Sequence, residues 1–287
     1  MGIKVENVFY TYLKKASNST LALQDVSLSI EKNDFVAIVG ETGSGKSTLV
    51  QMLNALLIPD KGQVLVDDFV VSYKNRKNRK IRNLRKQVGL VFQFPEYQLF
   101  EETVEKDVAF GVKNFGAKNE EALESAHRAL KSVGLDESYY QRPPFELSGG
   151  EKRKVAIAGI LALNPDIVIF DEPTVGFDPA SAKELMSLIV SMHQSGKTII
   201  VVTHDMDLVN EYAQKVFMLE KGKLVYSGST SNFYENILNN KWMEMEIPKI
   251  FKLALLLKEK GMDINLEEIH NIDDLVNCID NWRKQNG

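Results

Sequence analysis

Cysteine is almost absent from this sequence of 287 residues, in which Cys278 is the only one. One cysteine excludes a disulfide within the chain and fits a reducing compartment. Long apolar runs are missing too. The longest, residues 198–203 and 253–257, fall far below the roughly 20 residues that a membrane-spanning helix needs. No basic-then-apolar leader opens the chain. We therefore expect a cytoplasmic protein that meets any membrane only through a partner.

An excess of positive charge is also missing, because the formal net charge is −4. This balance excludes a global basic field that would favour nucleic acid. Basic residues do cluster within residues 74–86, but no aromatic beyond Tyr73 is interleaved with them. A phosphate-rich partner is conceivable there, and we interpret the cluster as a solvated loop and helix face. The composition, 44% hydrophobic and 26% charged, fits one large globular domain or a domain with an appendage.

The most informative segment that is present, residues 40–48, fits the pattern G-x-x-x-x-G-K-[ST] of a phosphate-binding loop. An apolar run typical of a buried strand precedes it, and a helical pattern over residues 48–57 follows and stops at Pro59. Glycines let the loop N–H groups point at phosphate oxygens, and Lys46 would reach the β- and γ-phosphates while Ser47 would bind Mg²⁺. A glycine-rich structural turn is the alternative. The residues expected to bind nucleotide are Gly40, Glu41, Thr42, Gly43, Ser44, Gly45, Lys46, Ser47 and Thr48.

Three further strand-like runs end in polar side chains: Gln93, the pair Asp171 and Glu172, and His204. The carboxyl ends of parallel strands meet at one edge of a sheet, so these side chains should lie beside the phosphate loop. Asp171 would hold Mg²⁺, and Glu172 could act as general base for the attacking water. The alternatives are two carboxylates that only close a strand and a histidine with a structural role.

The rest of the chain alternates between β and helical patterns. Tyr12 could stack on a nucleotide base or simply pack in its strand, whereas we assign Tyr10 to packing. Beyond residue 229 the composition turns helical and carries no nucleotide motif, which suits a small packing or dimerisation unit. Beta patterns cover residues 3–36, 62–71 and 216–226, and helical patterns cover 119–133, 152–163, 181–194, 250–260 and 272–284.

Taken together, residues 3–228 resemble the nucleotide-binding subunit of ABC transporters. Asp178 falls in what looks like the family's D-loop, and Tyr12 matches the aromatic that stacks on adenine. The signature motif ends in Glu151, where glutamine is commoner. Five motifs occur in the family's order: the phosphate loop, Gln93 as the Q-loop, residues 147–151 as the signature, Asp171 and Glu172 as Walker B with the catalytic glutamate, and His204 as the switch histidine.

The resemblance implies an α/β fold: a P-loop NTPase core of mainly parallel sheet with an antiparallel β subdomain and a helical signature subdomain. The nucleotide-binding domain would span residues 1–228, with the helical subdomain at about 97–162 and a helical C-terminal extension at 229–287. The implied ligands are ATP and Mg²⁺. Ser47, Gln93 and Asp171 would surround the metal, and Glu172, His204 and Gln93 would act in catalysis. Ser148, Gly149, Gly150 and Asp178 would contact nucleotide, the signature turn capping the γ-phosphate held by a second subunit.

A finer resemblance to the ATPases of energy-coupling factor (ECF) importers rests on residues 91–100, 107–111 and the tail after residue 247. It is closer to the second of that family's two paralogous ATPases. It implies an ATPase at the cytoplasmic face of the cell membrane that powers uptake of a vitamin or metal ion. The implied partners are a second homologous ATPase (heterodimer or homodimer), a membrane T component in a groove after Gln93 and, indirectly, a substrate-binding S component, with no nucleic acid. The alternatives are an ordinary ABC importer ATPase and a soluble ABC protein acting on ribosomes or nucleic acid.

Overall fold

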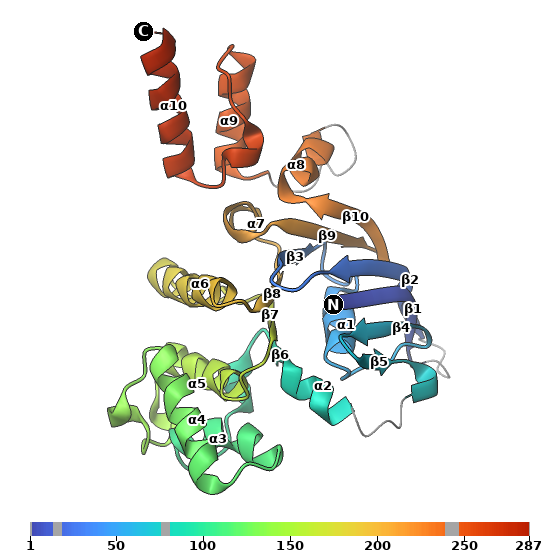
Figure 1. The fold of residues 1–287 in the computed structure, drawn as a ribbon, viewed down its shortest axis with the longest axis vertical. Helices are drawn as coiled ribbons and strands as arrows, with labels where there is room; N and C mark the ends of the chain where they lie inside the picture. Colours follow the sequence, from blue (N-terminus) through green and yellow to red (C-terminus); the bar gives the residue numbers. More distant parts are fainter. Residues whose placement is uncertain (1, 14–18, 76–80, 239–246, 287) are drawn as a thin grey trace.

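The computed structural model describes residues 2–13, 19–75, 81–238 and 247–286. Two β-sheets enclose a common core, a layer of helices covers the far face of the larger sheet, and the C-terminal helices pack at its edge (Figure 1). Part of the expected basic cluster, residues 76–80, and part of the expected C-terminal extension, residues 239–246, lie outside the described residues.

The smaller sheet is antiparallel, with strand order β2-β1-β4-β5. Its strands alternate buried and exposed positions, as in β2, where Val26, Leu28 and Ile30 face the core, because only one face of the sheet is covered. The expected β segment 62–71 is divided at Asp67, whose φ of 45° makes the turn. Tyr10 packs against the core, as expected. The strands are β1 (Ile3–Tyr12), β2 (Thr20–Ile30), β4 (Lys61–Val66) and β5 (Phe69–Val71).

The larger sheet has six strands in the order β10-β9-β3-β8-β7-β6. Five of them are parallel, and β10 pairs antiparallel with β9 as the expected hairpin. The strands β3, β6 and β8 are buried at every position, which explains their unbroken apolar runs, since both faces of the sheet are covered. The strands are β3 (Phe35–Val39), β6 (Val88–Val91), β7 (Ile167–Asp171), β8 (Thr198–Val202), β9 (Lys215–Glu220) and β10 (Lys223–Ser229).

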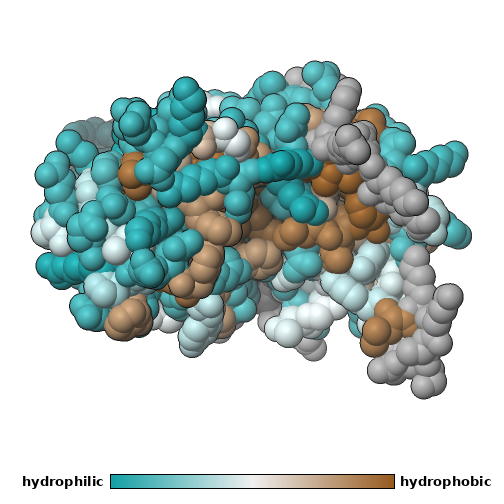
Figure 2. Space-filling model, turned by 90° about the horizontal axis from the view of Figure 1, so that it is seen from below, coloured by the Kyte–Doolittle hydropathy of each residue, from teal (hydrophilic) through white to brown (hydrophobic). Residues whose placement is uncertain are grey.

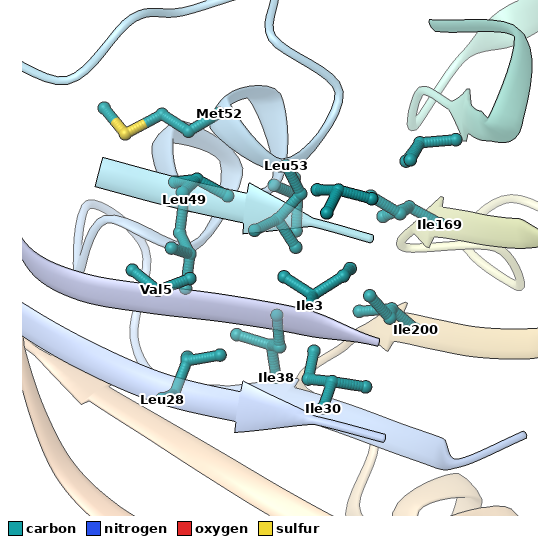
Figure 3. Close-up of a cluster of buried hydrophobic side chains, with 14 of the residues drawn as sticks. Ile3, Val5, Leu28, Ile30, Ile38, Leu49, Met52, Leu53, Ile169 and Ile200 are labelled. Atoms are coloured by element: carbon teal, nitrogen blue, oxygen red, sulfur yellow. The ribbon is translucent and has the colours of Figure 1, made fainter. Parts of the chain in front are cut away.

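Helix α1 (Lys46–Leu53) lies between the two sheets. Leu49 and Leu53 of this helix gather with Ile3 of β1 and Ile38 of β3 in one cluster of buried side chains (Figure 3). Each such side chain contributes about 1.5–3 kcal/mol when fully removed from water. The packing therefore fixes the start of α1, where the phosphate loop ends, against both sheets.

The expectation that this helix continues to residue 57 was wrong, because α1 ends at Leu53. Ala55 adopts a left-handed conformation with φ 56°. The N–H groups of Leu56 and Leu57 both donate back to the carbonyl of Gln51, at 2.8 and 3.1 Å. The chain therefore turns before Pro59 is reached.

Five helices follow the sequence from residue 81 to residue 194, and four of them form the layer on the far face of the large sheet (Figure 1). Arg82, Arg85 and Lys86, from the basic cluster, lie on the exposed side of α2, as expected. Helix α5 begins at Gly149 and not at residue 152, because Ser148 caps its N-terminus. The helices are α2 (Ile81–Gln87), α3 (Val104–Asn114), α4 (Asn119–Ser132), α5 (Gly149–Leu161) and α6 (Pro179–Gln194), with short 3₁₀ turns at Tyr73–Asn75, Pro95–Gln98, Glu137–Tyr139 and Pro144–Glu146.

The C-terminal helices are packed onto the edge of the large sheet. Phe233, Tyr234 and Phe251 are fully buried there, and the hydroxyl of Tyr234 donates to the carbonyl of Met206 at 2.9 Å. None of the helices in the described ranges combines the length and the apolar character needed to cross a membrane. The helices are α7 (Met206–Tyr212), α8 (Thr230–Leu238), α9 (Lys249–Glu259) and α10 (Ile272–Asn286), with a 3₁₀ turn at Leu266–Glu268.

The turn between β9 and β10 braces the phosphate loop. The N–H of Gly222 donates to the carbonyl of Ser44 at 2.9 Å, and the carbonyl of Gly222 accepts from the N–H of Gln24 at 2.7 Å. Gly222 has φ +80°, and a Cβ there would stand 2.7 Å from the carbonyl oxygen of Ala22. The sequence therefore needs glycine at this position for conformation and for space.

We expect Gly222→Ala to lower the free energy of unfolding by more than Gly196→Ala. Both positions have positive φ, so each substitution costs about 1–3 kcal/mol in backbone strain. A Cβ at Gly196 meets nothing within 4 Å, whereas one at Gly222 also displaces the backbone of β2. Urea unfolding of the two variants measures the difference. Equal losses would show that the turn does not brace the loop.

Candidate nucleotide-binding site

The parallel sheet brings the polar strand ends together at one edge. Strand β8 lies between β3, which leads into the phosphate loop, and β7, which ends at Asp171. The N–H of Glu172 donates to the carbonyl of Val202 at 2.8 Å, and the N–H of Thr203 donates to the carbonyl of Ile38 at 3.2 Å. These bonds align the ends of three neighbouring strands, so the residues that follow them share one side of the sheet.

The phosphate loop is held closed by its own lysine. Lys46 Nζ donates to the carbonyl oxygens of Gly40 and Glu41, at 2.7 and 2.8 Å. Burial lowers the pKa of Lys46, and the nearby carboxylates of Glu172 and Asp171 oppose that shift. Gly40, at φ +141°, passes so close to β9 that a Cβ would lie 2.2 Å from the carbonyl oxygen of Leu219. Glu41, Thr42 and Gly43 form the exposed tip of the loop.

Ser47, near the end of the phosphate loop, and Asp171, at the end of β7, lie side by side. Ser47 Oγ donates to Asp171 Oδ2 at 3.0 Å. Burial raises the pKa of Asp171, and its hydrogen bond from Ser47 opposes the shift. One hydroxyl and one carboxylate fit Mg²⁺, which takes hard oxygen ligands and usually completes its shell with water and substrate phosphates. Among the described residues, no group of three or more His, Cys, Asp or Glu could hold a metal, and Ser47 with Asp171 is the pair of oxygen donors that the structure brings together here.

Glu172 and His204 form a second pair beside the first. Glu172 has φ 51°, an uncommon value for a non-glycine residue, immediately after β7. His204 Nδ1 lies 2.9 Å from Glu172 Oε1, and the histidine side chain is 72% exposed against 13% for the glutamate. The other carboxylate oxygen of Glu172, Oε2, is buried and has no hydrogen-bond partner among the described residues. A buried acceptor without a partner at this edge suits a role in holding a reacting water.

Tyr12 stands near the start of α1. Its hydroxyl lies 3.2 Å from Thr48 Oγ1, within hydrogen-bond distance, and its ring packs edge-on against Tyr10 at 4.8 Å between centroids. The residue is 37% exposed. The structure therefore places it beside the phosphate loop with part of its surface free, and stacking on a base stays a prediction.

Gln93 is not part of this cluster of side chains. It follows β6 and is exposed, and its main-chain carbonyl accepts a hydrogen bond from Arg153 Nη2. Strand β6 pairs with β7, so Gln93 lies at the same edge of the sheet as Glu172. Its expected places at the metal and in catalysis stay predictions.

The signature residues form the N-terminal cap of α5. Ser148 Oγ accepts from the N–H of Glu151 at 3.3 Å, and Glu151 Oε2 accepts from the N–H of Ser148 at 2.8 Å. Tyr139 donates its hydroxyl to Glu151 Oε1 at 2.9 Å. The pKa of Glu151 is lowered, and the hydrogen bonds from Ser148 are the largest cause. Glutamate in place of the commoner glutamine thus completes a capping box and keeps the turn intact.

Packing within the chain does not explain the two signature glycines. A Cβ on Gly149 would meet nothing within 4 Å, and one on Gly150 would only touch Phe177 Cε1 at 4.0 Å. Helix α5 also lies well apart from α1 (Figure 1). The signature turn is thus separate from the phosphate loop of its own chain.

Asp178, the remaining predicted site residue, caps α6 by accepting hydrogen bonds from the N–H groups of Ala180 and Ser181, at 3.0 and 3.1 Å.

Sequence reasoning missed Arg153. It falls in the predicted helix 152–163, where a cation looks like an ordinary surface residue. In the structure it is only 6% exposed and contacts the segment after β6 and the loop after β7. The one local indication in the sequence that Arg153 is not an ordinary surface residue was its position two residues after the signature.

Comparison with known proteins places this geometry in a family. The family model described as ABC transporter matches residues 23–175. The chain is similar to the energy-coupling factor transporter ATP-binding protein EcfA2 of Streptococcus pneumoniae strain D39, with 50% identity over 91% of this chain and 94% of that protein. It is also similar to EcfA2 of Streptococcus agalactiae strain A909, with 49% identity over 97% of this chain and 99% of that protein.

Solved structures of ABC ATPases are also similar to this chain. CbiO1 of Clostridium perfringens, described as part of the ABC transporter complex cbiONQ, superposes with a TM-score of 0.72 at 36% identity, covering 90% of this chain and 96% of that one. The ATP-binding cassette MJ0796, a dimer bound to ADP and Pi, superposes with a TM-score of 0.71 at 30% identity, covering 79% of this chain and 98% of that one. The chain therefore belongs to the ABC transporter family and, within it, to the energy-coupling factor transporter ATP-binding proteins.

Proposed function

We propose that this chain binds and hydrolyses ATP at the edge formed by β3, β8 and β7, and that this reaction powers uptake of a vitamin or metal ion by an ECF-type importer. The observation that carries the proposal is the gathering of Lys46, the pair Ser47 and Asp171, and the pair Glu172 and His204 at one sheet edge. Such a set supplies the positioning and the charge stabilisation that dominate phosphoryl transfer.

The residues divide the work by their chemistry. Lys46 already binds two loop carbonyls, and a triphosphate would offer its ammonium stronger, charged acceptors in the same place. Bound Mg²⁺ would neutralise phosphate charge, and Ser47 with Asp171 would hold it. Glu172 would take the proton of the attacking water on its unpartnered oxygen, and His204, exposed beside it, would contact the γ-phosphate. Tyr12 would stack on the adenine.

We propose that catalysis needs a second ATPase subunit. Ser148, Gly149 and Gly150 open α5 with N–H groups at a positive helix end, but they lie apart from the phosphate loop of the same chain. The freedom from steric limits at both glycines suits close contact with a phosphate held by another chain. ATP would drive closure by binding the closed dimer more tightly than the open one. The dimeric state of the related cassette MJ0796 supports this arrangement. The partner would be a homologous ATPase.

A docking segment, residues 94–110, would receive the membrane T component. Its exposed aromatic side chains include Phe94, Tyr97 and Phe100, which are 44%, 84% and 63% exposed. Exposed aromatic side chains of this kind suit helices presented by a membrane protein. On the face of the molecule seen from below, hydrophobic surface gathers across the middle (Figure 2). Docking there would hold the chain at the cytoplasmic face of the membrane, and the S component would be reached only through the T component.

The rival functions are less well supported. Curated relatives that match more than nine-tenths of this chain are named as energy-coupling factor proteins, which favours that class over an ordinary ABC importer. The chain also covers 94% and 97% of the length of two such relatives, which disfavours a fused ABC protein that acts on ribosomes or nucleic acid.

We expect Glu172→Gln to lower the kcat for ATP by about 100- to 10,000-fold, which is the usual contribution of a positioned general base. The amide still bonds His204 but takes no proton, so ATP should stay bound and closed dimer should accumulate. Turnover assays and size-exclusion chromatography with ATP measure both effects. Glu124→Gln is the control, since that side chain on α4 is 74% exposed and away from the sheet edge. Unchanged turnover in Glu172→Gln would remove Glu172 from the chemistry.

We expect Tyr97→Ala to weaken assembly with the T component by about tenfold or more, as truncation of an interface aromatic does. Glu101→Lys tests the charge of the same segment and should also weaken assembly, with ATP binding retained in both variants. Charge reversal at Glu96 is less suitable, because that carboxylate is 19% exposed and faces Arg153. Tyr73→Ala, at a tyrosine 51% exposed outside the segment, is the control. Full co-purification of the Tyr97 and Glu101 variants would argue against this docking surface.

A further inference from the structure

Arg153 carries a buried charge at the start of the second turn of α5. Its guanidinium donates to two main-chain carbonyls on different loops, from Nη2 to Gln93 and from Nη1 to Val175, the second at 2.5 Å. Nε lies 3.7 Å from Glu96 Oε2. Burial lowers the pKa of Arg153, and the carboxylate of Glu96 opposes that shift. A buried cation is retained only where partners compensate its lost hydration, and here the partners belong to two functional loops.

The surroundings are shaped to receive a planar guanidinium. The ring of Phe177 lies 4.7 Å and the ring of Phe94 5.9 Å from the guanidinium carbon, so one aromatic from each loop faces the cation. Gly176 lies beside the guanidinium, and a Cβ there would make ordinary van der Waals contact with Nη1, at 3.9 Å. Lysine could not reproduce this set of contacts, since an ammonium is a point charge and not a fork.

The two loops that Arg153 joins both leave the catalytic edge of the sheet. One follows β6 and carries Gln93 and then the docking segment. The other follows β7, and Val175 stands three residues after Glu172. A displacement of α5 therefore reaches both loops through one side chain. The same helix begins at the signature turn.

We propose that Arg153 is a positioning residue for ATP hydrolysis: it fixes the loop after Glu172 and the segment after β6 on the signature helix, so that the three move as one body. When the signature turn closes onto a partner's nucleotide, it then sets the position of Glu172. Docking at residues 94–110 acts on the position of Glu172 through the same side chain. The proposal rests on the ATPase cycle proposed above and not on the identity of the cargo.

The test compares Arg153→Met and Arg153→Lys with Lys154→Met in the purified complex of the full-length subunits. Lys154 is the matched control, because it is the next cation on α5 but binds Glu184 on α6, at 2.9 Å. Arg153→Met should lower kcat by about 10- to 100-fold, the usual effect of a small misplacement of reacting groups. KM for ATP should change by less than about twofold, because ground-state binding is untouched. Arg153→Lys should fall between the wild type and Arg153→Met, and Lys154→Met should match the wild type.

Amide hydrogen exchange separates positioning from general loss of structure. In Arg153→Met, exchange should rise in residues 93–98 and in residues 173–178 together, with α4 and the rest of α5 as protected as in the wild type. A rise in only one of the two loops, a rise spread over α3 to α5, or wild-type kcat in Arg153→Met would overturn the proposal. If Glu172→Gln keeps its turnover while the Arg153 variants behave as expected, the proposed general base fails and the coupling of the two loops stands.

Discussion

The pairing of parallel strands in the order β3-β8-β7-β6 is the constraint on which the site depends. Helices and the second sheet cover both faces of this sheet, so the strand interiors have no room for a charge. Charged groups can stand only where the strands end. Because the strands are parallel and in register, those ends lie next to each other, and residues more than 120 positions apart, such as Ser47 and Asp171, come within hydrogen-bond distance.

The charged groups at this edge are hydrogen-bonded to neutral groups of the protein, and a substrate could take the place of those partners. Lys46 binds carbonyl groups of its own loop, and Asp171 accepts a hydrogen bond from Ser47. Partial burial disfavours the charged form of both residues, which is why the pKa of Lys46 is lowered and that of Asp171 is raised. In the proposed reaction, a triphosphate with its metal would bring the opposite charge to each of them. Binding would then relieve the cost of keeping both charges partly buried.

The helical layer carries the signature turn, which is not part of the sheet edge. The signature turn at Ser148 is preformed by its capping box with Glu151, yet it stands away from the phosphate loop of its own chain. Arg153, one turn further along α5, ties that turn to the loops leaving β6 and β7. The helical layer is therefore connected to the proposed catalytic edge by hydrogen bonds to the backbone, and these bonds hold the helical layer in place against the edge of the sheet.

Local sequence determined the strands, most helices and the phosphate loop, because apolar periodicity and a glycine pattern act over a few residues and need no distant partner. It also placed Asp171, Glu172 and His204 at strand ends, from which their meeting followed once the sheet was taken as parallel. The tertiary structure decided the end of α1, the inward-facing carboxylate of Glu96 and the burial of Arg153. The positions of Glu96 and Arg153 depend on groups tens of residues away, which no local pattern encodes, and the turn after α1 is held in part by Arg85, whose Nη2 donates to the carbonyl of Ala55 at 2.9 Å.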